Sequence, residues 1–162
     1  MQLLAGDKAI AVTTLNIPHP YEDGMAEKWI GSHQDRFEKD IEIVFAITIK
    51  GSGELIGAIG LTLNLDHESA ELGYWVGKPF WDHGYCTEAA QAVLHYAFIE
   101  LRLNRIHARH FSHNPASGRV MQKVGMKPEG HFRQNVKKWG QFIDSEFYGV
   151  LRSEFELSRE IR

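Results

Sequence analysis

The amino-acid sequence predicts a mixed α/β (α+β) fold in which helices flank a largely antiparallel sheet. Apolar residues alternate with their neighbours along two consecutive segments, 41–50 and 55–65, and a period of two marks strands with one buried face. Apolar residues then recur three and four positions apart along 84–101, which marks an amphipathic helix. The hydrophobic content of 43% over 162 residues suits one compact core, so we expect residues 1–162 to form a single domain.

The N-terminal part of the chain is predicted to be helical. Residues 1–14 are compatible with at most a short helix. Residues 18–21 form a rigid extended turn, because proline fixes its own φ angle and restricts the residue before it. Residues 25–37 carry apolar side chains at helical spacing and therefore predict a second helix.

The middle of the chain predicts three strands. Residues 41–50 and 55–65 are joined by Gly51-Ser52-Gly53. Two period-two segments around a glycine-rich turn form an antiparallel hairpin. Residues 69–76 are the candidate for a third strand.

The second half of the chain alternates helices with strands. The helix at 84–101 has an apolar stripe wide enough to face a sheet, and a short strand follows at 105–111. A helix is predicted at 114–125, since proline near its start and glycine at its end are typical of helix boundaries. Strands follow near 127–137 and 141–151. The predicted order is helix, three strands, helix, strand, helix and two strands.

Composition and charge exclude several classes of protein. The formal net charge is −3 and no long basic run occurs, so we expect no nucleic-acid partner. No apolar run approaches the roughly 18 residues of a membrane span, and no signal peptide opens the chain, so we expect no membrane association. Cys86 is the single cysteine, which excludes an intramolecular disulfide and a cysteine-based zinc cluster and agrees with a cytoplasmic location.

The turn before the long helix is the first candidate ligand site. Backbone N–H groups at the start of a helix have no partner within the helix, and the helix dipole there favours anions. Gly84 lets the backbone approach a ligand, and Cys86 leaves room for it. Thr87 can add a hydroxyl donor and His83 a partial charge. The turn therefore predicts a cradle for a pyrophosphate, although a plain loop with a glycine and a threonine cap accounts for the same residues equally well.

Two other phosphate-binding motifs do not fit the sequence. The segment 73–78 has one residue too few between its glycines for a Walker A loop, and Pro79 stands where that loop has serine or threonine. No Gly-x-Gly-x-x-Gly occurs either. Nucleotide triphosphatases and Rossmann-type dinucleotide-binding proteins are therefore excluded.

Two neighbouring segments, 71–76 and 81–89, resemble the acetyl-CoA motif of the GNAT acetyltransferase superfamily. The similarity is greatest to the RimJ/RimL-type branch, which acetylates protein N-termini. The resemblance extends from Pro20 to about Leu151. Several motifs in the expected order and at the expected spacing are stronger evidence for the family than any single motif. The further matching residues are Arg105-Ile106, Asn114, Ser117, Val124-Gly125-Met126, Glu129-Gly130, Asp144 and Tyr148.

The sequence departs from the family pattern at three points. Trp81 stands where the superfamily usually has glutamine or arginine, although this branch often has tryptophan. Cys86 stands where glycine or alanine is usual. The family also begins with a strand ahead of its first helix, and we expect this strand to be missing here. An exposed neighbouring strand would be open to pairing with a second copy of the chain, which favours a homodimer.

The resemblance implies an N-acetyltransferase that moves an acetyl group from acetyl-CoA to a primary amine by direct attack on the thioester. The amine would belong to a protein N-terminus or to a small molecule. The alternative is a CoA-binding module of the same fold with a regulatory rather than a catalytic role. In either case the resemblance places the phosphates of the coenzyme on Trp81, His83, Gly84, Tyr85, Cys86 and Thr87.

The resemblance also implies where the reaction would take place. The pantetheine arm of the coenzyme would lie between the third and fourth predicted strands. Backbone groups of Trp75 and Val76 and the side chain of Asn114 would bind it. Ser117 would donate a hydrogen bond to the leaving thiolate.

Other roles stay open for these residues. Asn114 also suits a helix cap, and Ser117 suits a surface hydroxyl in the capping turn. Glu71 is the best candidate for the base that takes the proton of the amine, with His110 and His113 as rivals. A solvent-facing strand residue explains Glu71 equally well. No tyrosine follows Ser117 in its helix, where many members of the superfamily keep their acid.

Histidines and aromatic residues give two weaker indications. Among nine histidines, His107, His110 and His113 are the densest set, but a strand places His107 and His110 on opposite faces. We therefore expect no metal site. The cosubstrate that the resemblance implies is acetyl-CoA. By resemblance, Tyr21 and Trp139 would border the acceptor side, whereas packing explains most of the other aromatic residues.

Overall fold

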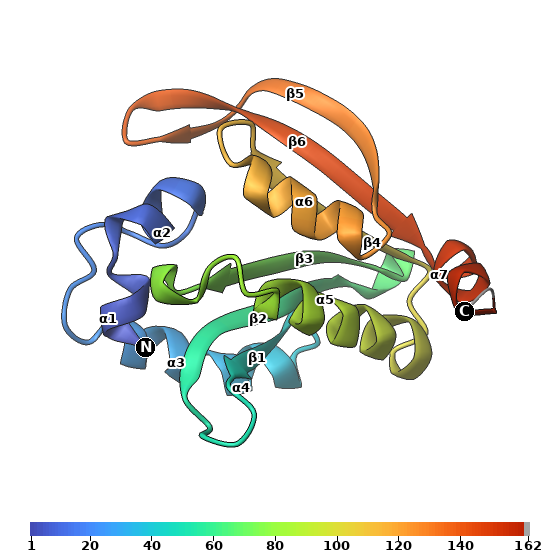
Figure 1. Ribbon diagram of the computed structural model, residues 1–162, viewed down its shortest axis with the longest axis horizontal. Helices are drawn as coiled ribbons and strands as arrows, with labels where there is room; N and C mark the ends of the chain where they lie inside the picture. Colours follow the sequence, from blue (N-terminus) through green and yellow to red (C-terminus); the bar gives the residue numbers. More distant parts are fainter. Residues whose placement is uncertain (161–162) are drawn as a thin grey trace.

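A six-stranded sheet with the strand order β1-β2-β3-β4-β6-β5 forms the centre of the computed structural model, which describes residues 1–160 and side chains up to residue 157 (Figure 1). Every neighbouring pair of strands is antiparallel except β3 and β4, which are parallel. The predicted mixed fold with a largely antiparallel sheet is therefore confirmed. The strands are β1 (Glu42–Thr48), β2 (Leu55–Asn64), β3 (Ser69–Val76), β4 (Arg105–Phe111), β5 (Lys127–Lys138) and β6 (Gln141–Leu151).

Helices precede the sheet, connect its strands and follow it. In residues 1–160, none of them is long and apolar enough to cross a bilayer. The longest α-helix is continued by a π-helical turn, η3, so that together they cover most of the predicted long helix. The helices are α1 (Gln2–Ala5), α2 (Lys8–Thr13), α3 (Met25–Gly31), α4 (His33–Glu38), α5 (Tyr85–His95), α6 (Pro115–Lys123) and α7 (Arg152–Glu160), with the short turns η1 (Leu65–His67), η2 (Lys78–Phe80) and η3 (Tyr96–Glu100).

The two predicted N-terminal helices are each divided in two. The carboxylate of Asp7 accepts a hydrogen bond from the backbone N–H of Ala9 and caps α2, which separates α2 from α1. Between α3 and α4, the Ser32 hydroxyl donates to the carbonyl of Trp29 at 2.7 Å. Short polar side chains compete with the helical backbone in this way, so apolar spacing alone predicted too few helices.

The last helix, α7, was not predicted, because its segment carries few apolar side chains. Phe155 is one of them, and its ring packs against Phe98 with centroids 5.0 Å apart. A short helix of this kind is stabilised mainly by such tertiary packing rather than by its own sequence pattern.

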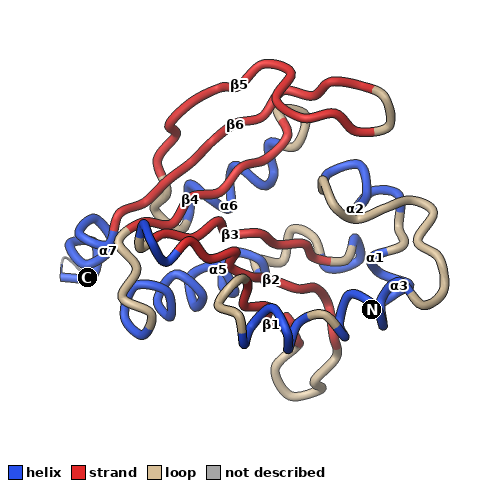
Figure 2. The backbone as a smooth tube through the Cα atoms, turned by 180° about the vertical axis from the view of Figure 1, so that it is seen from behind, coloured by secondary structure: helices blue, strands red, loops and turns tan. Residues whose placement is uncertain are grey.

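The hydrophobic core lies between the sheet and the helices α5 and α6, which cover the face seen in Figure 1. Figure 2 shows the opposite face, where β2, β3 and β4 lie in front of these helices. In both views α1, α2 and α3 gather at one end of the sheet. The core side chains that are 3% exposed or less include Leu61, Leu72, Leu94, Phe98, Ile106 and Met121.

The parallel pair β3 and β4 separates soon after it begins. Residues 69–71 pair with residues 105–107, and no further pair joins the two strands. β3 nevertheless stays paired with β2 as far as Val76, and β4 stays paired with β6 as far as Phe111. The sheet therefore opens into a V, whose inner edges carry backbone N–H and C=O groups without a strand partner in the described chain. This opening lies between the third and fourth predicted strands, where the family resemblance implied the pantetheine arm.

The strand β1 forms one edge of the sheet and pairs with β2 alone. In the described residues no strand lies ahead of α1. The helix α4 packs beside β1, while the outer hydrogen-bonding edge of β1 has no strand partner in this part of the chain. The homodimer expected from such an edge stays a prediction.

Candidate active site

A cavity of about 980 Å³ occupies the opening between β3 and β4. Its walls come from the end of β3, the turn before α5, the start of α6 and residues 13–18 near the N-terminus. The structure brings together nearly all of the residues that the sequence singled out, although they lie on separate elements. Those lining the cavity include Glu71, Trp75, Val76, Trp81, Gly84, Tyr85, Cys86, Thr87, His110, Asn114 and Ser117.

The turn before α5 has the backbone conformation that its glycine suggests. Gly84 occupies the N-cap position with φ +84°, in the left-handed region that favours glycine. Thr87 does not cap the helix, and no side chain does, so the first N–H groups of α5 remain available for a ligand. The indole N–H of Trp81 donates to the carbonyl of Val76 at 2.6 Å and fixes the turn to the end of β3.

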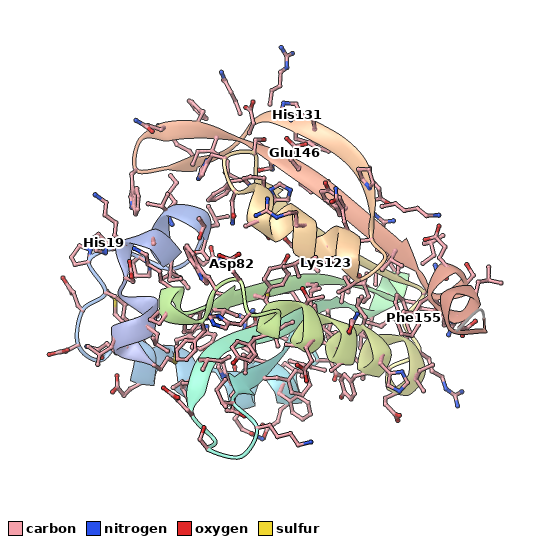
Figure 3. All side chains as sticks on the ribbon, in the orientation of Figure 1. His19, Asp82, Lys123, His131, Glu146 and Phe155 are labelled. Atoms are coloured by element: carbon pink, nitrogen blue, oxygen red, sulfur yellow. The ribbon has the colours of Figure 1, made fainter. Side chains whose placement is uncertain are left out.

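Of the six residues predicted to bind the phosphates of the coenzyme, five line the cavity and His83 does not. Its Nδ1 lies 2.6 Å from the carbonyl of Trp81, and its ring stacks on Tyr85 with centroids 5.6 Å apart. His83 therefore braces the turn rather than lining the space beside it. Asp82 of this turn and Lys123 of α6, both labelled in Figure 3, do line the cavity.

Cys86 lies in the first turn of α5, partly buried. Burial raises the pKa of its thiol to about 12, because a thiolate would lose its solvation there. The thiol is therefore neutral near pH 7, and it contributes a small uncharged side chain to the wall of the cavity.

Asn114 and Ser117 stand at the start of α6, beside the inner edge of β4. Asn114 holds the N-cap position that the alternative interpretation gave it, but its side chain makes no capping hydrogen bond, so the amide is available to a ligand. Ser117 is partly buried rather than a free surface hydroxyl. Both side chains line the cavity, where an amide and a hydroxyl can bind a polar arm.

Tyr74 is a site residue that sequence reasoning missed. Its hydroxyl lies 2.9 Å from Oγ of Ser117 and 3.0 Å from the carbonyl oxygen of Ser117. The two residues come from β3 and α6, on opposite sides of the opening. A signal was present in the sequence, because strand alternation places Tyr74 on the same face as Leu72 and Val76, the face that α5 and α6 cover. A tyrosine hydroxyl thus reaches Ser117 from the sheet, although α6 has none.

Glu71 lies where β3 and β4 separate, since it belongs to the last pair that joins them. It lines the cavity and forms an ion pair with Arg109, with 3.0 Å between Oε1 and Nε. Its side chain is 36% exposed, so it is neither fully solvent-facing nor buried.

The two rival histidines differ in accessibility. His110 is buried, its Nδ1 lies 2.8 Å from the carbonyl of Phe111, and its Nε2 has no hydrogen-bond partner. His113 is exposed and does not line the cavity; its Nε2 lies 3.1 Å from the carbonyl of Val12. Within the described residues, no three His, Cys, Asp or Glu side chains are placed to hold a metal ion.

The aromatic residues also separate. Tyr21 and Trp29 line the end of the cavity nearest the N-terminus, whereas Trp139 is 55% exposed and does not line it. Beside Trp139, the ammonium of Lys138 is buried and donates to the carbonyls of Thr14, Leu15 (3.3 Å) and Ile17 (3.2 Å). Lys138 was not singled out from the sequence, because nothing in its neighbourhood along the chain indicates this contact.

Comparison with known proteins decides the family. Residues 2–127 match the family model of the acetyltransferase (GNAT) domain. The chain is also 37% identical over 131 residues to the probable N-acetyltransferase YjcK of Bacillus subtilis, an alignment that covers 80% of this chain and 72% of YjcK. The chain belongs to the GNAT acetyltransferase family. Members of this family are acetyl-CoA-dependent acetyltransferases. The prediction from the sequence that this GNAT protein is an enzyme of that class is therefore confirmed.

Two further comparisons refine the placement of this GNAT chain. It is 23% identical over 128 residues to the [ribosomal protein uS5]-alanine N-acetyltransferase of Escherichia coli, covering 78% of this chain and 66% of that protein, which agrees with the RimJ/RimL-type branch. The structure of a spermidine N-acetyltransferase from Vibrio cholerae in complex with CoA and spermine has a TM-score of 0.81 at 22% identity, covering 96% and 89% of the two chains, and shows the same fold. The chain spans 57% to 65% of the length of four other Bacillus relatives.

Proposed function

We propose that this chain is an N-acetyltransferase that moves the acetyl group of acetyl-CoA to a primary amine by direct attack of the amine on the thioester. The observation that carries the proposal is the cavity between β3 and β4. It joins an uncapped helix start, an unpaired strand edge and the Tyr74–Ser117 hydroxyl pair in one continuous space. We propose that residues 1–162 act in this reaction as a single domain.

The coenzyme fits the half of the cavity formed by β3, α5 and α6. Its pyrophosphate would accept hydrogen bonds from the first N–H groups of α5, in the turn 81–87. Arg119 and Lys123 of α6 line the same space and can pair with phosphate groups. The pantetheine arm would bind the unpaired edge of β3 at Trp75 and Val76, and the side chain of Asn114. These groups are the donors and cations that such a ligand requires.

The chemistry assigns a role to each remaining candidate. Glu71 would accept the proton of the incoming ammonium, so that a neutral nitrogen attacks the carbonyl carbon. A backbone N–H on the unpaired edge of β3 near Val76 would stabilise the oxyanion. The bond between carbon and sulfur then breaks, and Ser117 would donate a hydrogen bond to the sulfur, which keeps the electron pair.

The amine would bind in the rest of the cavity, the acceptor half, which is lined by residues 13–18, Tyr21, Trp29, Glu42 and Glu71. The charges of the acceptor half favour an acceptor with one amine, such as a peptide N-terminus, over a polyamine. Two carboxylates line this half, Glu42 and Glu71, and each is paired with an arginine. The Nε of Arg36 lies 2.7 Å from Glu42, and Arg109 pairs with Glu71. Because these arginines offset the negative charge, little remains to attract a second or third ammonium group.

The test is an acceptor screen that measures thiol release from acetyl-CoA with N-terminal peptides, single amino acids and spermidine. We expect a peptide to accelerate release most. Ser117→Ala should lower kcat about tenfold to a hundredfold, because a hydrogen bond to a charged group is lost. The matched control is Ser112→Ala, since Ser112 donates to Glu146 and does not line the cavity.

The alternative of a regulatory CoA-binding module predicts a different result. Acetyl-CoA would then bind tightly, no amine would raise thiol release, and Ser117→Ala would change nothing. Faster thiol release with spermidine than with every peptide would instead support the proposed enzyme activity but overturn the proposed preference for an acceptor with one amine. The homodimer and the cytoplasmic location stay predictions.

A further inference from the structure

We propose that Tyr74 acts through Ser117 as a positioning residue, so that two hydroxyl groups in series stabilise the leaving thiolate of coenzyme A. This inference rests on the proposed function and gives a role to a residue of the 71–76 motif to which the resemblance assigned none. The tyrosine that many GNAT proteins keep in the helix after Ser117 is missing here, and Met121 is buried in that helix instead. A tyrosine from β3 reaches the same serine.

The geometry allows two arrangements of the hydroxyl protons. Tyr74 can donate to the carbonyl oxygen of Ser117 at 3.0 Å, while the Ser117 hydroxyl donates to Tyr74 at 2.9 Å. Alternatively, Tyr74 donates to Oγ of Ser117, and the proton of Ser117 is then free to point into the cavity. Both arrangements keep the heavy atoms in place, because the hydroxyl protons rotate.

The environment keeps Tyr74 in its donating form. Burial raises the pKa of the Tyr74 phenol well above its ordinary value, although the hydrogen bond with Ser117 partly opposes this. Cys86 lies near Tyr74 and has a thiol pKa raised to about 12. A neutral phenol and a neutral thiol therefore both line the cavity in which negative charge would develop.

The developing charge selects the second arrangement. When the bond between the acetyl carbon and sulfur breaks, the electron pair stays on sulfur, and the new bond between nitrogen and carbon has formed. Ser117 donates to the sulfur, and Tyr74 donates to Oγ of Ser117, which strengthens the first hydrogen bond because linked donors polarise one another. Neither hydroxyl gives up its proton. The proton lost by the amine balances the one that coenzyme A finally gains.

A purely structural role is the competing explanation, since the same hydrogen bonds join α6 to β3. The two explanations differ in what Tyr74→Phe should change. A structural brace would weaken CoA binding or lower the melting temperature, whether or not Ser117 is present. A positioning residue would act on the charge of the sulfur and would lose its effect when Ser117 is removed.

To test this role, we titrate the thiol of bound coenzyme A by NMR. The coenzyme is labelled with ¹³C on the carbon beside the sulfur. We compare wild type, Tyr74→Phe, Ser117→Ala and the double variant. At one pH, Tyr74→Phe should lower the ionised fraction of the thiol about three- to tenfold, as expected for one neutral hydrogen bond. Ser117→Ala should lower it further, and the double variant should match Ser117→Ala. The control is Tyr148→Phe, a buried hydroxyl 3.2 Å from Gln122 that does not line the cavity.

This readout does not depend on finding an acceptor, so failure of the proposed function leaves the thiol titration informative. In acetyl transfer, Tyr74→Phe should lower the single-turnover rate by the same factor with an unchanged KM for acetyl-CoA. The inference is overturned if Tyr74→Phe leaves the thiol titration unchanged. It is also overturned if its effect is as large in the Ser117→Ala background as in wild type, or appears only in CoA affinity.

Discussion

The coenzyme half and the acceptor half of the cavity are held in place by different kinds of contact. In the coenzyme half, Trp81 donates to the carbonyl of Val76 only five residues earlier, and Gly84 then begins α5. In the acceptor half, residues 14–17 are held by the ammonium of Lys138, which lies 124 residues after Thr14 in the chain. The turn of the coenzyme half is therefore held by a local contact, whereas residues 14–17 of the acceptor half are held by contacts with a distant segment of the chain.

This difference decides how each half should respond to change. Local contacts form together with the strand and helix that flank them, so they can be damaged at a single position. Contacts between distant segments depend on how the β5–β6 hairpin and the N-terminal segment meet. A substitution in one half should therefore affect the binding of one substrate and leave the other largely unchanged.

Among the substitutions that test the difference between the two halves, Gly84→Val in the coenzyme half should have the largest effect. Gly84 has φ +84°, and a residue with a side chain is strained there by about 1–2 kcal/mol. The turn would relax away from the conformation that exposes the first N–H groups of α5. We expect the Kd for CoA, measured by calorimetry, to rise about five- to thirtyfold.

The chain provides a matched control in the other half. Gly24 is also an N-cap with φ +84°, at the start of α3, and a Cβ there would contact nothing within 4 Å. Gly24→Val should strain the backbone as Gly84→Val does but leave the Kd for CoA near that of wild type. Equal losses of CoA affinity in both variants would show that the two halves are not separate.

A smaller effect, on the binding of the acceptor rather than of the coenzyme, is expected from Lys138→Met. Methionine keeps the apolar stem of the side chain but removes the ammonium that holds the carbonyls of Thr14, Leu15 and Ile17. These residues line the acceptor half, so we expect the KM for the acceptor to rise about three- to tenfold. The Kd for CoA should not change.

The control for this variant is the neighbouring lysine. Lys137 is exposed, and its ammonium lies 5.4 Å from the centre of the Phe142 ring. Lys137→Met removes the same charge from the same hairpin without touching residues 14–17. If Lys137→Met raised the KM of the acceptor as much as Lys138→Met does, general charge rather than the buried contact would explain the result.

The same division explains what could be predicted from the sequence. The predicted bounds of β3 and β4 match the structure, and Asn114, Ser117 and the turn at 81–87 were singled out because they lie in compact motifs. Periodicity could not reveal the interruption at Ser32, because a side-chain hydrogen bond decides it. Tyr74 was missed because its role depends on a partner 43 residues away, and Lys138 because its partners lie at the other end of the chain.

The smallest expected effect is a pH dependence confined to the β5–β6 hairpin. His131 of β5 lies 2.8 Å from Glu146 of β6 and 3.4 Å from Asp144, and Figure 3 labels the first two side chains on neighbouring strands. The pKa of His131 is raised mainly by its hydrogen bond with Glu146, and the negative charges of Glu146 and Asp144 raise it further. The protonated imidazole therefore stabilises the folded hairpin.

The sign of the effect follows from the raised pKa. The contribution of His131 is fully present below about pH 6.5, the ordinary value for histidine, and is lost as the pH rises through the higher pKa of the folded protein. In His131→Gln, the stability of the hairpin should change less between about pH 6 and pH 9 than in wild type. The measurement is hydrogen exchange of the hairpin amides, corrected for the intrinsic exchange rate. His19→Gln, in the N-terminal segment, is the control.

Added salt should shrink the difference between wild type and His131→Gln, because the ion pairs are exposed to solvent and screened. The Kd for CoA should show no matching change over the same pH range, since neither carboxylate lines the cavity. A parallel change in CoA affinity that vanished in His131→Gln would mean that the hairpin reaches the coenzyme half. The division between the two halves would then hold for their contacts but not for their energetics.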